Sequence, residues 1–286
     1  MTIVVDKPGS LTLIQDLGRA GFAHLAVPRS GAADRAACIR ANRRVGNPDN
    51  AAVLEMTLLG ARLRFEAEAA IALAGADMHA RLDGVDVALD TLVTVQRGQT
   101  LACHAALRGV RTYLAVAGGI DAPLFLGSSA RDLLSGIGPP PLRAGDRLVF
   151  GRAHGAEGPP APAPEFVDEP VLRFLPGPRD DWFVPAALAA LAEGAFTVSA
   201  DSNRIATRLT GPLLTRAIGR ELPSEGLVPG AIQVPPDGQP VVMLADHPTT
   251  GGYPVIGVVL EEDLWQLAQS QPGRRVRFTR TETAEP

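Results

Sequence analysis

Short apolar runs separated by Gly and Pro recur along the chain, and this pattern predicts a fold made mainly of β-strands. In the first half the predicted strands are Ile3–Val5, Leu11–Gln15, Val53–Thr57, Arg62–Glu66, Ala70–Ala74, Leu92–Val95, Arg111–Ala117 and Leu142–Phe150. Asp83-Gly84, between two further short runs, predicts a tight hairpin turn. One segment has the pattern of a helix, Ala33–Val45, with Ser30 or Asp34 as the N-cap and Gly46 just past its end.

A stretch rich in Pro, Gly and Ala has the composition of a stiff linker. We therefore predict a first domain over residues 1–151, a linker over 152–166 and a second domain over 167–286. The strands predicted in the second domain are Val171–Leu175, Phe196–Ser199, Ile232–Val234, Val241–Leu244, Val255–Val259 and Arg274–Arg280. Helices are predicted at Trp182–Glu193 and Glu261–Gln271.

Composition narrows the class of protein. The chain has 286 residues, 46% of them apolar and 20% charged, with a net charge of −4. The negative balance argues against nucleic-acid binding, which needs a basic footprint. No apolar run reaches the roughly 18 residues of a membrane span, and the first residues do not have the pattern of a signal peptide. We expect a cytoplasmic protein without a membrane segment.

Several kinds of chemistry are missing from the sequence. Lys7 is the only lysine, so the chain has no P-loop, and no Schiff-base lysine unless Lys7 serves. Cys38 and Cys103 give neither a disulfide framework nor a metal-ligand spacing, and we expect them to be small core residues. The histidines also lack metal-ligand spacing, so no metal site is expected. Ser30-Gly31 does not fit the nucleophile elbow of a serine hydrolase.

Three polar, Gly-rich segments look like loops yet are dense in functional groups: residues 15–34, 223–235 and 246–254. Their glycines let backbone N–H groups approach a ligand, and their Asp, Arg, Thr and Gln side chains supply donors and acceptors. The alternative is that Gly and Pro simply make turns between strands. Spacing alone leaves both interpretations open.

These segments, together with Asn42–Asn47 and Leu54–Gly60, resemble the biotin-dependent carboxyltransferase family, also called allophanate hydrolase subunit 2. That family includes the C-type subunit of ATP-dependent 5-oxoprolinase and subdomains A and B of the urea carboxylase and urea amidolyase carboxyltransferase. The resemblance extends from about Ile3 to Phe278 and implies two cyclophilin-like β-barrel subdomains. The order of Gln15–Arg19, Ser30–Asp34, Gly230–Pro235 and Thr249–Pro254 makes it specific.

The resemblance also implies partners and substrates. Relatives act beside an allophanate hydrolase subunit 1-like protein, the B-type subunit of 5-oxoprolinase, and with an A-type subunit. The implied substrate is a small amide or lactam: 5-oxo-L-proline, opened to L-glutamate with ATP, or urea carboxylated by carboxybiotin from a separate carrier. Because the biotin-carrier turn needs a lysine between methionines and Lys7 lies in Asp6-Lys7-Pro8, no cofactor is expected to be covalently bound. A third hypothesis is a non-catalytic antagonist of an inhibitor partner.

The candidate site residues come from the three segments. Candidates for catalysis are Asp16, Arg19, Asp246 and His247. Candidates for substrate binding are Gln15, Ser30, Asp34, Ser224, Glu225, Gln233, Thr249, Thr250, Gly251, Gly252 and Tyr253. We predict that they gather around one cleft.

Several of these residues have a structural alternative. An Asp16–Arg19 ion pair that shapes the loop is favoured over direct ligand contact. His247 is either an acid–base residue or a solvated loop residue. Thr249 and Thr250 either bond a ligand or stabilise a turn. Glu55, inside an apolar strand, either faces a barrel mouth or pairs with an arginine, because an unpaired buried charge is costly.

Overall fold

The computed structural model describes residues 1–151, 163–219 and 221–282. The chain forms two compact units, one of residues 1–20 and 30–165 and the other of residues 21–29 and 166–286. The segment 21–29 is thus grouped with the second unit, where Arg29 pairs with Glu261 at 3.3 Å. The predicted linker lies largely in 152–162, outside the described residues, so the domain boundary stays a prediction.

The first unit is built from two sheets. One has the order β11-β12-β1-β4-β9-β6-β7 and the other β2-β3-β10-β5-β8. Strands of the first are β1 Thr2–Lys7, β4 Arg62–Phe65, β6 Arg81–Leu82, β7 Val85–Asp86, β9 Thr100–Ala102, β11 Ile120–Asp121 and β12 Arg147–Phe150. Strands of the second are β2 Leu11–Gln15, β3 Val53–Thr57, β5 Ala69–Asp77, β8 Val93–Val95 and β10 Arg108–Val116.

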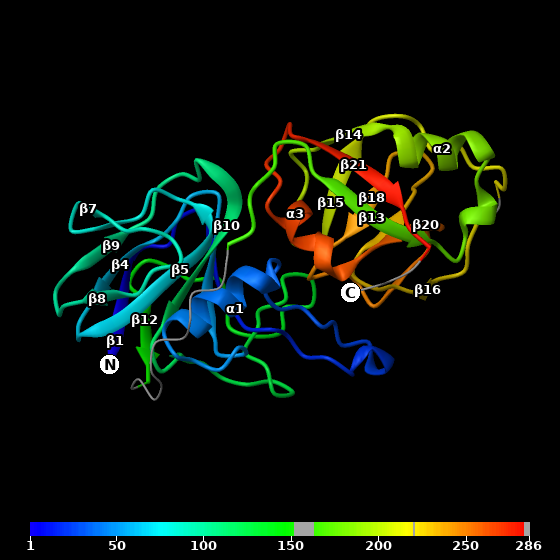
Figure 1. Ribbon diagram of the computed structural model, residues 1–286. Helices are drawn as coiled ribbons and strands as arrows, with labels where there is room; N and C mark the ends of the chain where they lie inside the picture. The colour runs from blue at the N-terminus through cyan, green and yellow to red at the C-terminus, as the bar shows by residue number, and fades with distance from the viewer. Residues whose placement is uncertain (152–162, 220, 283–286) are drawn as a thin grey trace. The chain divides into compact units, whose positions relative to one another are not determined.

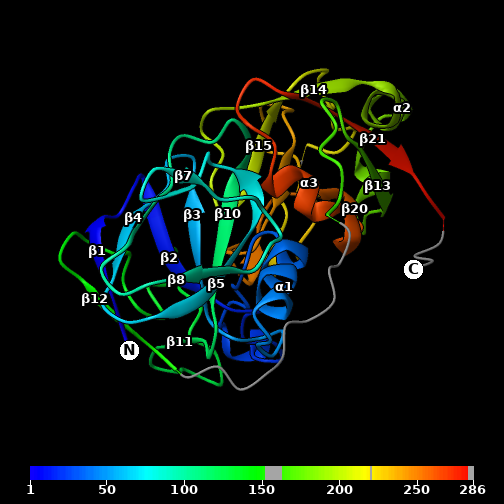
Figure 2. The ribbon, with the colours of Figure 1, turned by 60° about the vertical axis from the view of Figure 1, so that its left-hand side comes forward.

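Strand alternation divides the apolar residues of this unit between two cores. Ile71, Leu73 and Leu114 belong to a cluster that includes residues of both sheets. The residues between them on β5 and β10 are mostly alanines, and they face the helix α1, Arg35–Arg44, through Ala37, Cys38 and Ala41. Figures 1 and 2 both show α1 beside β5 and β10. Small side chains on both surfaces allow this close packing.

The second unit is a closed barrel in the order β13-β20-β17-β18-β15-β14-β21. Its strands are β13 Val171–Pro176, β14 Ala195–Val198, β15 Ala206–Thr210, β17 Ala231–Gln233, β18 Val241–Met243, β20 Val255–Val259 and β21 Arg275–Arg280. Closure comes from the parallel pairing of β13 with β21. Phe174, Phe196 and Phe278 fill the interior, with Phe278 edge-on to the other two rings. The mainly-β prediction is confirmed.

The helices are shorter than predicted. Asp34 caps α1 by accepting the backbone N–H of Ala37 at 2.9 Å, which decides between the two candidate caps. The predicted helix 182–193 divides into a 3-10 turn, η2 Asp180–Trp182, and α2 Pro185–Glu193, since Pro185 at the first helical position keeps Val184 extended. The last helix divides likewise into η3 Glu261–Asp263 and α3 Leu264–Ala268.

One predicted strand needs correction, and several strands were missed. The predicted strand 142–150 begins at Arg147, because residues 143–146 form a turn in which Asp146 accepts the backbone N–H of Arg143. Strands β9 and β15, which have mixed sequences, were not predicted, and neither were the two-residue strands β11, β16 (Glu225–Gly226) and β19 (Thr250–Gly251). The predicted hairpin at Asp83-Gly84 is confirmed, with positive φ at both residues.

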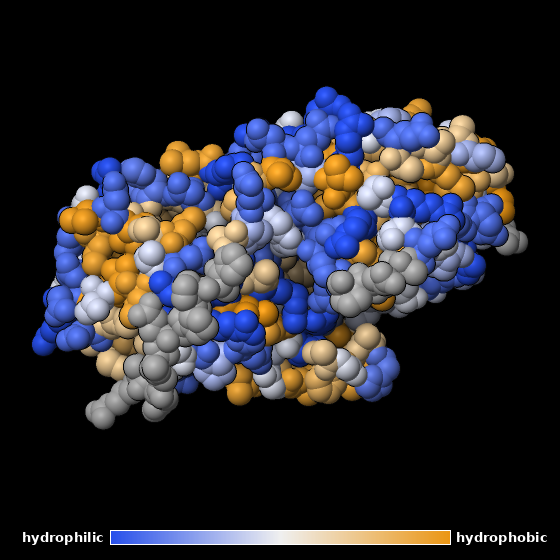
Figure 3. Space-filling model, viewed as in Figure 1, coloured by the Kyte–Doolittle hydropathy of each residue, from blue (hydrophilic) through white to orange (hydrophobic). Residues whose placement is uncertain are grey.

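The described residues include no helix long and apolar enough to cross a membrane. The face drawn in Figure 3 carries hydrophilic side chains with hydrophobic ones interspersed.

Candidate functional site

The Asp16 carboxylate is a buried anchor in the first unit. Its Oδ1 accepts the N–H of Gly18 and the hydroxyl of Ser128, each at 2.7 Å. Its Oδ2 accepts the N–H of Ser129 at 2.7 Å and the Ser129 hydroxyl at 3.3 Å. These bonds, and not the predicted ion pair with Arg19, fix the carboxylate. Asp16 therefore joins the end of β2 to a segment more than a hundred residues later in the chain.

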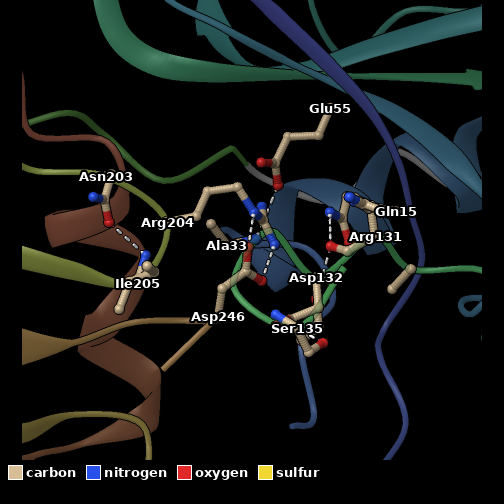
Figure 4. A network of polar contacts seen from close by, with 12 residues as sticks. Gln15, Ala33, Glu55, Arg131, Asp132, Ser135, Asn203, Arg204, Ile205 and Asp246 are labelled. Atoms are coloured by element: carbon tan, nitrogen blue, oxygen red, sulfur yellow. Dashed lines mark hydrogen bonds and ion pairs between the residues drawn. The ribbon is translucent and has the colours of Figure 1, made fainter. Parts of the chain in front are cut away.

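The predicted segments 15–19 and 30–34 lie against each other and against the same partner. The side chains of Gln15 and Ser30 both donate to the carbonyl of Arg131, at 2.8 and 2.9 Å. Arg19 donates to the neighbouring carbonyl of Ala130, and the N–H of Ala32 donates to the carbonyl of Asp16 at 2.8 Å. Figure 4 shows the Gln15 amide at the Arg131 carbonyl. The first two candidate segments thus form one structure with residues 128–132.

The 128–132 segment was not predicted from the sequence. Gly127-Ser128-Ser129-Ala130-Arg131-Asp132 is as polar and glycine-led as the three predicted segments, and that composition could have identified it. Asp132 is fully buried, and its Oδ1 accepts both the N–H and the hydroxyl of Ser135, at 2.6 and 2.7 Å. Segment 128–132 is therefore fixed at its start by hydrogen bonds to Asp16 and at its end by those between Asp132 and Ser135.

A pocket of about 420 Å³ opens beside this anchor in the first unit. Asp16 and Ser129 line it together with Asn47, Asn50 and the Gly118-Gly119 turn. The oxygen of Asn50 accepts the N–H of Leu17 at 2.8 Å, so the amide of Asn50 is oriented by the candidate loop. The lining combines amides, a hydroxyl and glycine backbone with apolar side chains such as Ile120 and Leu124, which suits a small ligand with one polar group.

Asp34 and Glu55 meet through a buried tyrosine. The Tyr113 hydroxyl accepts the N–H of Asp34 at 2.7 Å and donates to Glu55 Oε2 at 2.8 Å. Glu55 Oε2 also accepts the N–H of Ala33 at 3.0 Å, and Arg111 Nε lies 3.7 Å from Glu55 Oε1. The predicted pairing of Glu55 with an arginine is confirmed. Burial first, then the charges of Glu55 and Asp34, hold the pKa of Tyr113 well above its usual range, which keeps the phenol a donor.

Tyr113→Phe is expected to lower the free energy of unfolding by about 1–3 kcal/mol, because a buried N–H and a buried carboxylate each lose a partner. Chemical denaturation measures this. The matched control is Tyr253→Phe, at an exposed residue, which should change stability by less than about 0.5 kcal/mol. Equal effects of the two substitutions would show that the Tyr113 hydroxyl does not hold Asp34 and Glu55.

In the second unit, Asp246 and Arg204 form a buried, two-pronged ion pair. Arg204 Nε and Nη2 each donate to one carboxylate oxygen of Asp246 at 2.9 Å, and the Arg204 and Asp246 side chains are 1% and 0% exposed. The N–H of Asp246 donates to the carbonyl of Arg204 at 3.0 Å. Figure 4 shows both side-chain bonds. This geometry fixes the start of the Gly-rich segment 246–254.

His247 follows directly and is 5% exposed, so the alternative of a solvated loop residue is wrong. Its Nδ1 lies 2.7 Å from the carbonyl oxygen of Pro248. Because a carbonyl oxygen only accepts, Nδ1 carries the proton, and Nε2 is the basic nitrogen of the neutral ring. The backbone thereby selects the tautomer with the ring proton on Nδ1.

The other candidates of the second unit lie around a two-stranded ribbon. Strand β16, Glu225–Gly226, pairs with β19, Thr250–Gly251. Gln233 donates to the carbonyl of Tyr253 at 3.1 Å, and a Cβ on Gly251 would lie 2.5 Å from the Gln233 amide nitrogen. Glu225 forms an ion pair with Arg179. The ribbon therefore brings Glu225, Gln233 and the segment 249–253 together.

The remaining candidates are less constrained. Ser224, Gly252 and Thr250 are exposed, and Thr249 is partly buried. Within the described part of the chain, neither threonine hydroxyl has a hydrogen-bond partner, which leaves both available to a ligand. No cluster of His, Cys, Asp and Glu able to hold a metal ion occurs among the described residues. Cys38 and Cys103 are buried as predicted, and burial raises the pKa of Cys103 to about 12.

A family model described as carboxyltransferase domain, subdomain A and B, matches residues 25–280. The chain belongs to this carboxyltransferase family. It is 39% identical to the C-type subunit of 5-oxoprolinase from Escherichia coli over 282 residues, covering 98% of this chain and 91% of that protein. It is 32% identical to urea amidolyase of Saccharomyces cerevisiae over 304 residues, covering 96% of this chain but 16% of that protein.

Solved structures agree with the family assignment. The crystal structure of Kluyveromyces lactis urea amidolyase matches with a TM-score of 0.92 and 30% identity over 97% of this chain, which spans 18% of that chain. The crystal structure of TTHA0988 matches with a TM-score of 0.90 and 38% identity over 97% of this chain, which spans 55% of that chain. The resemblance found in the sequence and the fold class are confirmed.

Within the family fold, the candidate residues form two groups, one in each unit. Gln15, Asp16, Arg19, Ser30 and Asp34 lie in the first unit. The candidates from Ser224 to Tyr253 lie in the second. That both groups border a single cleft stays a prediction.

Proposed function

We propose that this chain is the C-type subunit of an ATP-dependent 5-oxoprolinase, which opens 5-oxo-L-proline to L-glutamate. The observation that carries the proposal is the 39% identity to the Escherichia coli C-type subunit, which extends over 98% of this chain and 91% of that protein. The match to the corresponding Haemophilus influenzae subunit covers 88% of that protein. By contrast, this chain matches only 16% of each of the fungal urea amidolyases.

The chemistry requires help because a lactam carbonyl is a poor electrophile. Phosphorylation of the lactam oxygen by ATP releases ADP and makes the ring carbon open to attack by water. The C–N bond then breaks as the nitrogen takes up a proton, and a second water hydrolyses the resulting acyl phosphate to L-glutamate and inorganic phosphate. A protein contributes by positioning the lactam, by accepting a proton from the attacking water and by stabilising the negative charge that develops. In this proposal, other subunits supply ATP binding, and this chain is inactive alone.

His247 is the proposed proton acceptor in the second unit. Its Nδ1–H is held by the Pro248 carbonyl, which makes Nε2 the basic nitrogen of the neutral ring. The buried Arg204–Asp246 pair positions the backbone immediately before it. The hydroxyls of Thr249 and Thr250 and the Gln233 amide are proposed to bind the planar N–C=O group. In the first unit, the pocket beside Asp16 is a second place for such a neutral group.

Reconstitution tests the proposal. The chain is combined with its A-type and B-type partner subunits, 5-oxo-L-proline and ATP are added, and glutamate and ADP are measured. We expect both products from the complete complex, and neither ATP turnover nor a biotin adduct from the isolated chain, whose only lysine is Lys7. Glutamate formation by the partners without this chain would contradict the proposal.

The second candidate function is the carboxyltransferase component of a urea carboxylase system. The observation in its favour is the TM-score of 0.92 with Kluyveromyces lactis urea amidolyase. In the same reconstitution, carboxylation of urea by a carboxybiotin-loaded carrier, with no lactam opening, would favour it. Stable complex formation with neither reaction would favour the antagonist of an inhibitor partner.

A further inference from the structure

The second unit contains a pocket of about 660 Å³ whose lining does not include Arg204, Asp246 or His247. It lies between the loop after β15, the Pro235–Gly238 turn and the end of the Gly-rich segment at Gly252-Tyr253. A volume of this size is within the range of small-molecule sites. Because Gln233 holds the carbonyl of Tyr253, one wall is continuous with the candidate residues already described.

Among the described residues that line this pocket, Arg216 is the one with a basic side chain. Its backbone is fixed by a β-bridge to Phe183, and its Nη2 donates to the carbonyl of Val234. Its Nε is buried and has no hydrogen-bond partner within the described ranges. Burial, which removes water from the guanidinium, lowers the pKa of Arg216. Within the described residues Arg216 has no ion-pair partner, so its positive charge at the pocket wall is available to an anionic ligand.

The rest of the lining limits the anion that fits. Glu221 and Asp237 are exposed acidic residues of the lining, and neither forms an ion pair with Arg216. Their negative charges disfavour a polyphosphate and tolerate a single negative charge. The pocket also has an apolar wall, which suits a compact carbon skeleton. This wall is made by Leu213, Leu214, Leu222, Pro235 and Pro236.

We propose that this pocket binds a small monocarboxylic acid, with its carboxylate at Arg216 and its carbon ring against the leucines and prolines. The inference rests on the proposed function, since it assigns a place to the carboxylate of 5-oxoproline. It also separates the two candidate reactions, because urea has no carboxylate for Arg216 to bind. Arg216 is thus a specificity residue for the acid group and is distinct from the proposed proton acceptor.

The test compares 5-oxo-L-proline with its neutral carboxamide, which keeps the lactam ring and loses only the charge. Binding to the isolated chain is measured by calorimetry or by ligand-observed NMR. We expect the acid to bind at least about tenfold more tightly than the amide. Arg216→Gln should weaken binding of the acid roughly ten- to hundredfold, the expected worth of a charged hydrogen bond, and leave binding of the amide unchanged.

Arg208→Gln is the matched control, since Arg208 is exposed on β15 and does not line the pocket. It should not alter the preference for the acid, and a thermal melt should show both variants folded. Equal binding of acid and amide by the parent chain would overturn the proposal without any variant. Tighter binding of inorganic phosphate or ATP than of 5-oxoproline would overturn the assignment to a monocarboxylate.

Turnover of the reconstituted complex separates this inference from the proposed function. If the complex opens 5-oxoproline, and Arg216→Gln raises KM with little change in kcat, the proposed function and the proposed carboxylate site are both supported. If the Arg216→Gln complex turns over 5-oxoproline with an unchanged KM, the assignment of the carboxylate to Arg216 is wrong and the proposed function is unaffected. Arg216-dependent binding of the acid without turnover by the parent complex overturns the function and leaves the pocket.

Discussion

Asp246→Asn is expected to lower the free energy of unfolding of the second unit by about 3–5 kcal/mol, the cost of breaking a buried ion pair from one side. Arg204 is 1% exposed and donates to both oxygens of Asp246 at 2.9 Å. An asparagine keeps the shape and one acceptor, but it presents an N–H₂ group to a guanidinium that can only donate. Urea denaturation, followed by the fluorescence of Trp182 and Trp265, reports on this unit.

Asp168→Asn is the matched control in the same unit. Its partner Arg274 is 3.3 Å away, and the Asp168 and Arg274 side chains are 81% and 51% exposed. A pair in water contributes at most about 1 kcal/mol, so this variant should unfold nearly as the parent does. If both variants lost the same small amount, the Arg204–Asp246 pair would not be the element that holds the 246–254 segment.

A double replacement separates stability from function at this pair. Arg204→Met with Asp246→Leu removes both charges and keeps apolar volume, and such exchanges of buried pairs are often neutral or stabilising. We expect the double variant to recover most of the lost stability. We also expect it to remain inactive in the reconstituted complex, because the backbone leading into His247 is no longer fixed by two directed hydrogen bonds. Full activity would show that the pair has no role in positioning His247.

The parts of the fold that could be predicted are those set by local signals. The β10 strand is almost continuously buried and mostly apolar from Val110 on, and the Asp83-Gly84 turn has the residues that positive φ requires. Strands β9 and β15 were missed because their sequences, Thr-Leu-Ala and Ala-Thr-Arg-Leu-Thr, are specified by pairing with distant strands. Tertiary pairing overrides weak local preference there.

The same reason limits what the sequence says about the site. Residues within one segment, such as Thr249 to Tyr253, were found by composition. Composition could have identified the 128–132 segment, but not that Ser128 and Ser129 bond to Asp16, which is 112 and 113 positions away. We expected Asp16 to pair with Arg19 because Arg19 is the opposite charge nearest to it in the sequence. The hydrogen-bond donors to the Asp16 carboxylate are instead backbone N–H groups and serine hydroxyls. Every residue type except proline has a backbone N–H, so the sequence does not show which one a carboxylate will bind.

The contact between the two candidate segments of the first unit predicts a second large effect. Gly31 has φ of +96°, and a Cβ there would lie 2.7 Å from the nitrogen of Gly18 and 2.8 Å from the carbonyl carbon of Leu17. Both atoms belong to backbone, so no side chain can turn away. Gly31→Ala should therefore lower the free energy of unfolding in two ways. The left-handed backbone conformation costs an alanine about 1–2 kcal/mol, and the clash of its Cβ with backbone costs about 1–3 kcal/mol more.

Gly21→Ala separates these two costs. Gly21 has nearly the same φ, +93°, but a Cβ there would meet nothing within 4 Å. The free energy of unfolding of Gly21→Ala should fall only by the cost of the left-handed backbone conformation, about 1–2 kcal/mol. The difference between the two variants, measured by chemical denaturation, is then the overpacking cost at the contact between residues 15–19 and 30–34. Because Asp16 joins that contact to Ser128 and Ser129, amide hydrogen exchange should rise at residues 128–132 in Gly31→Ala and stay unchanged in Gly21→Ala. Unchanged exchange at 128–132 in both variants would show that the three segments do not form one cooperative structure.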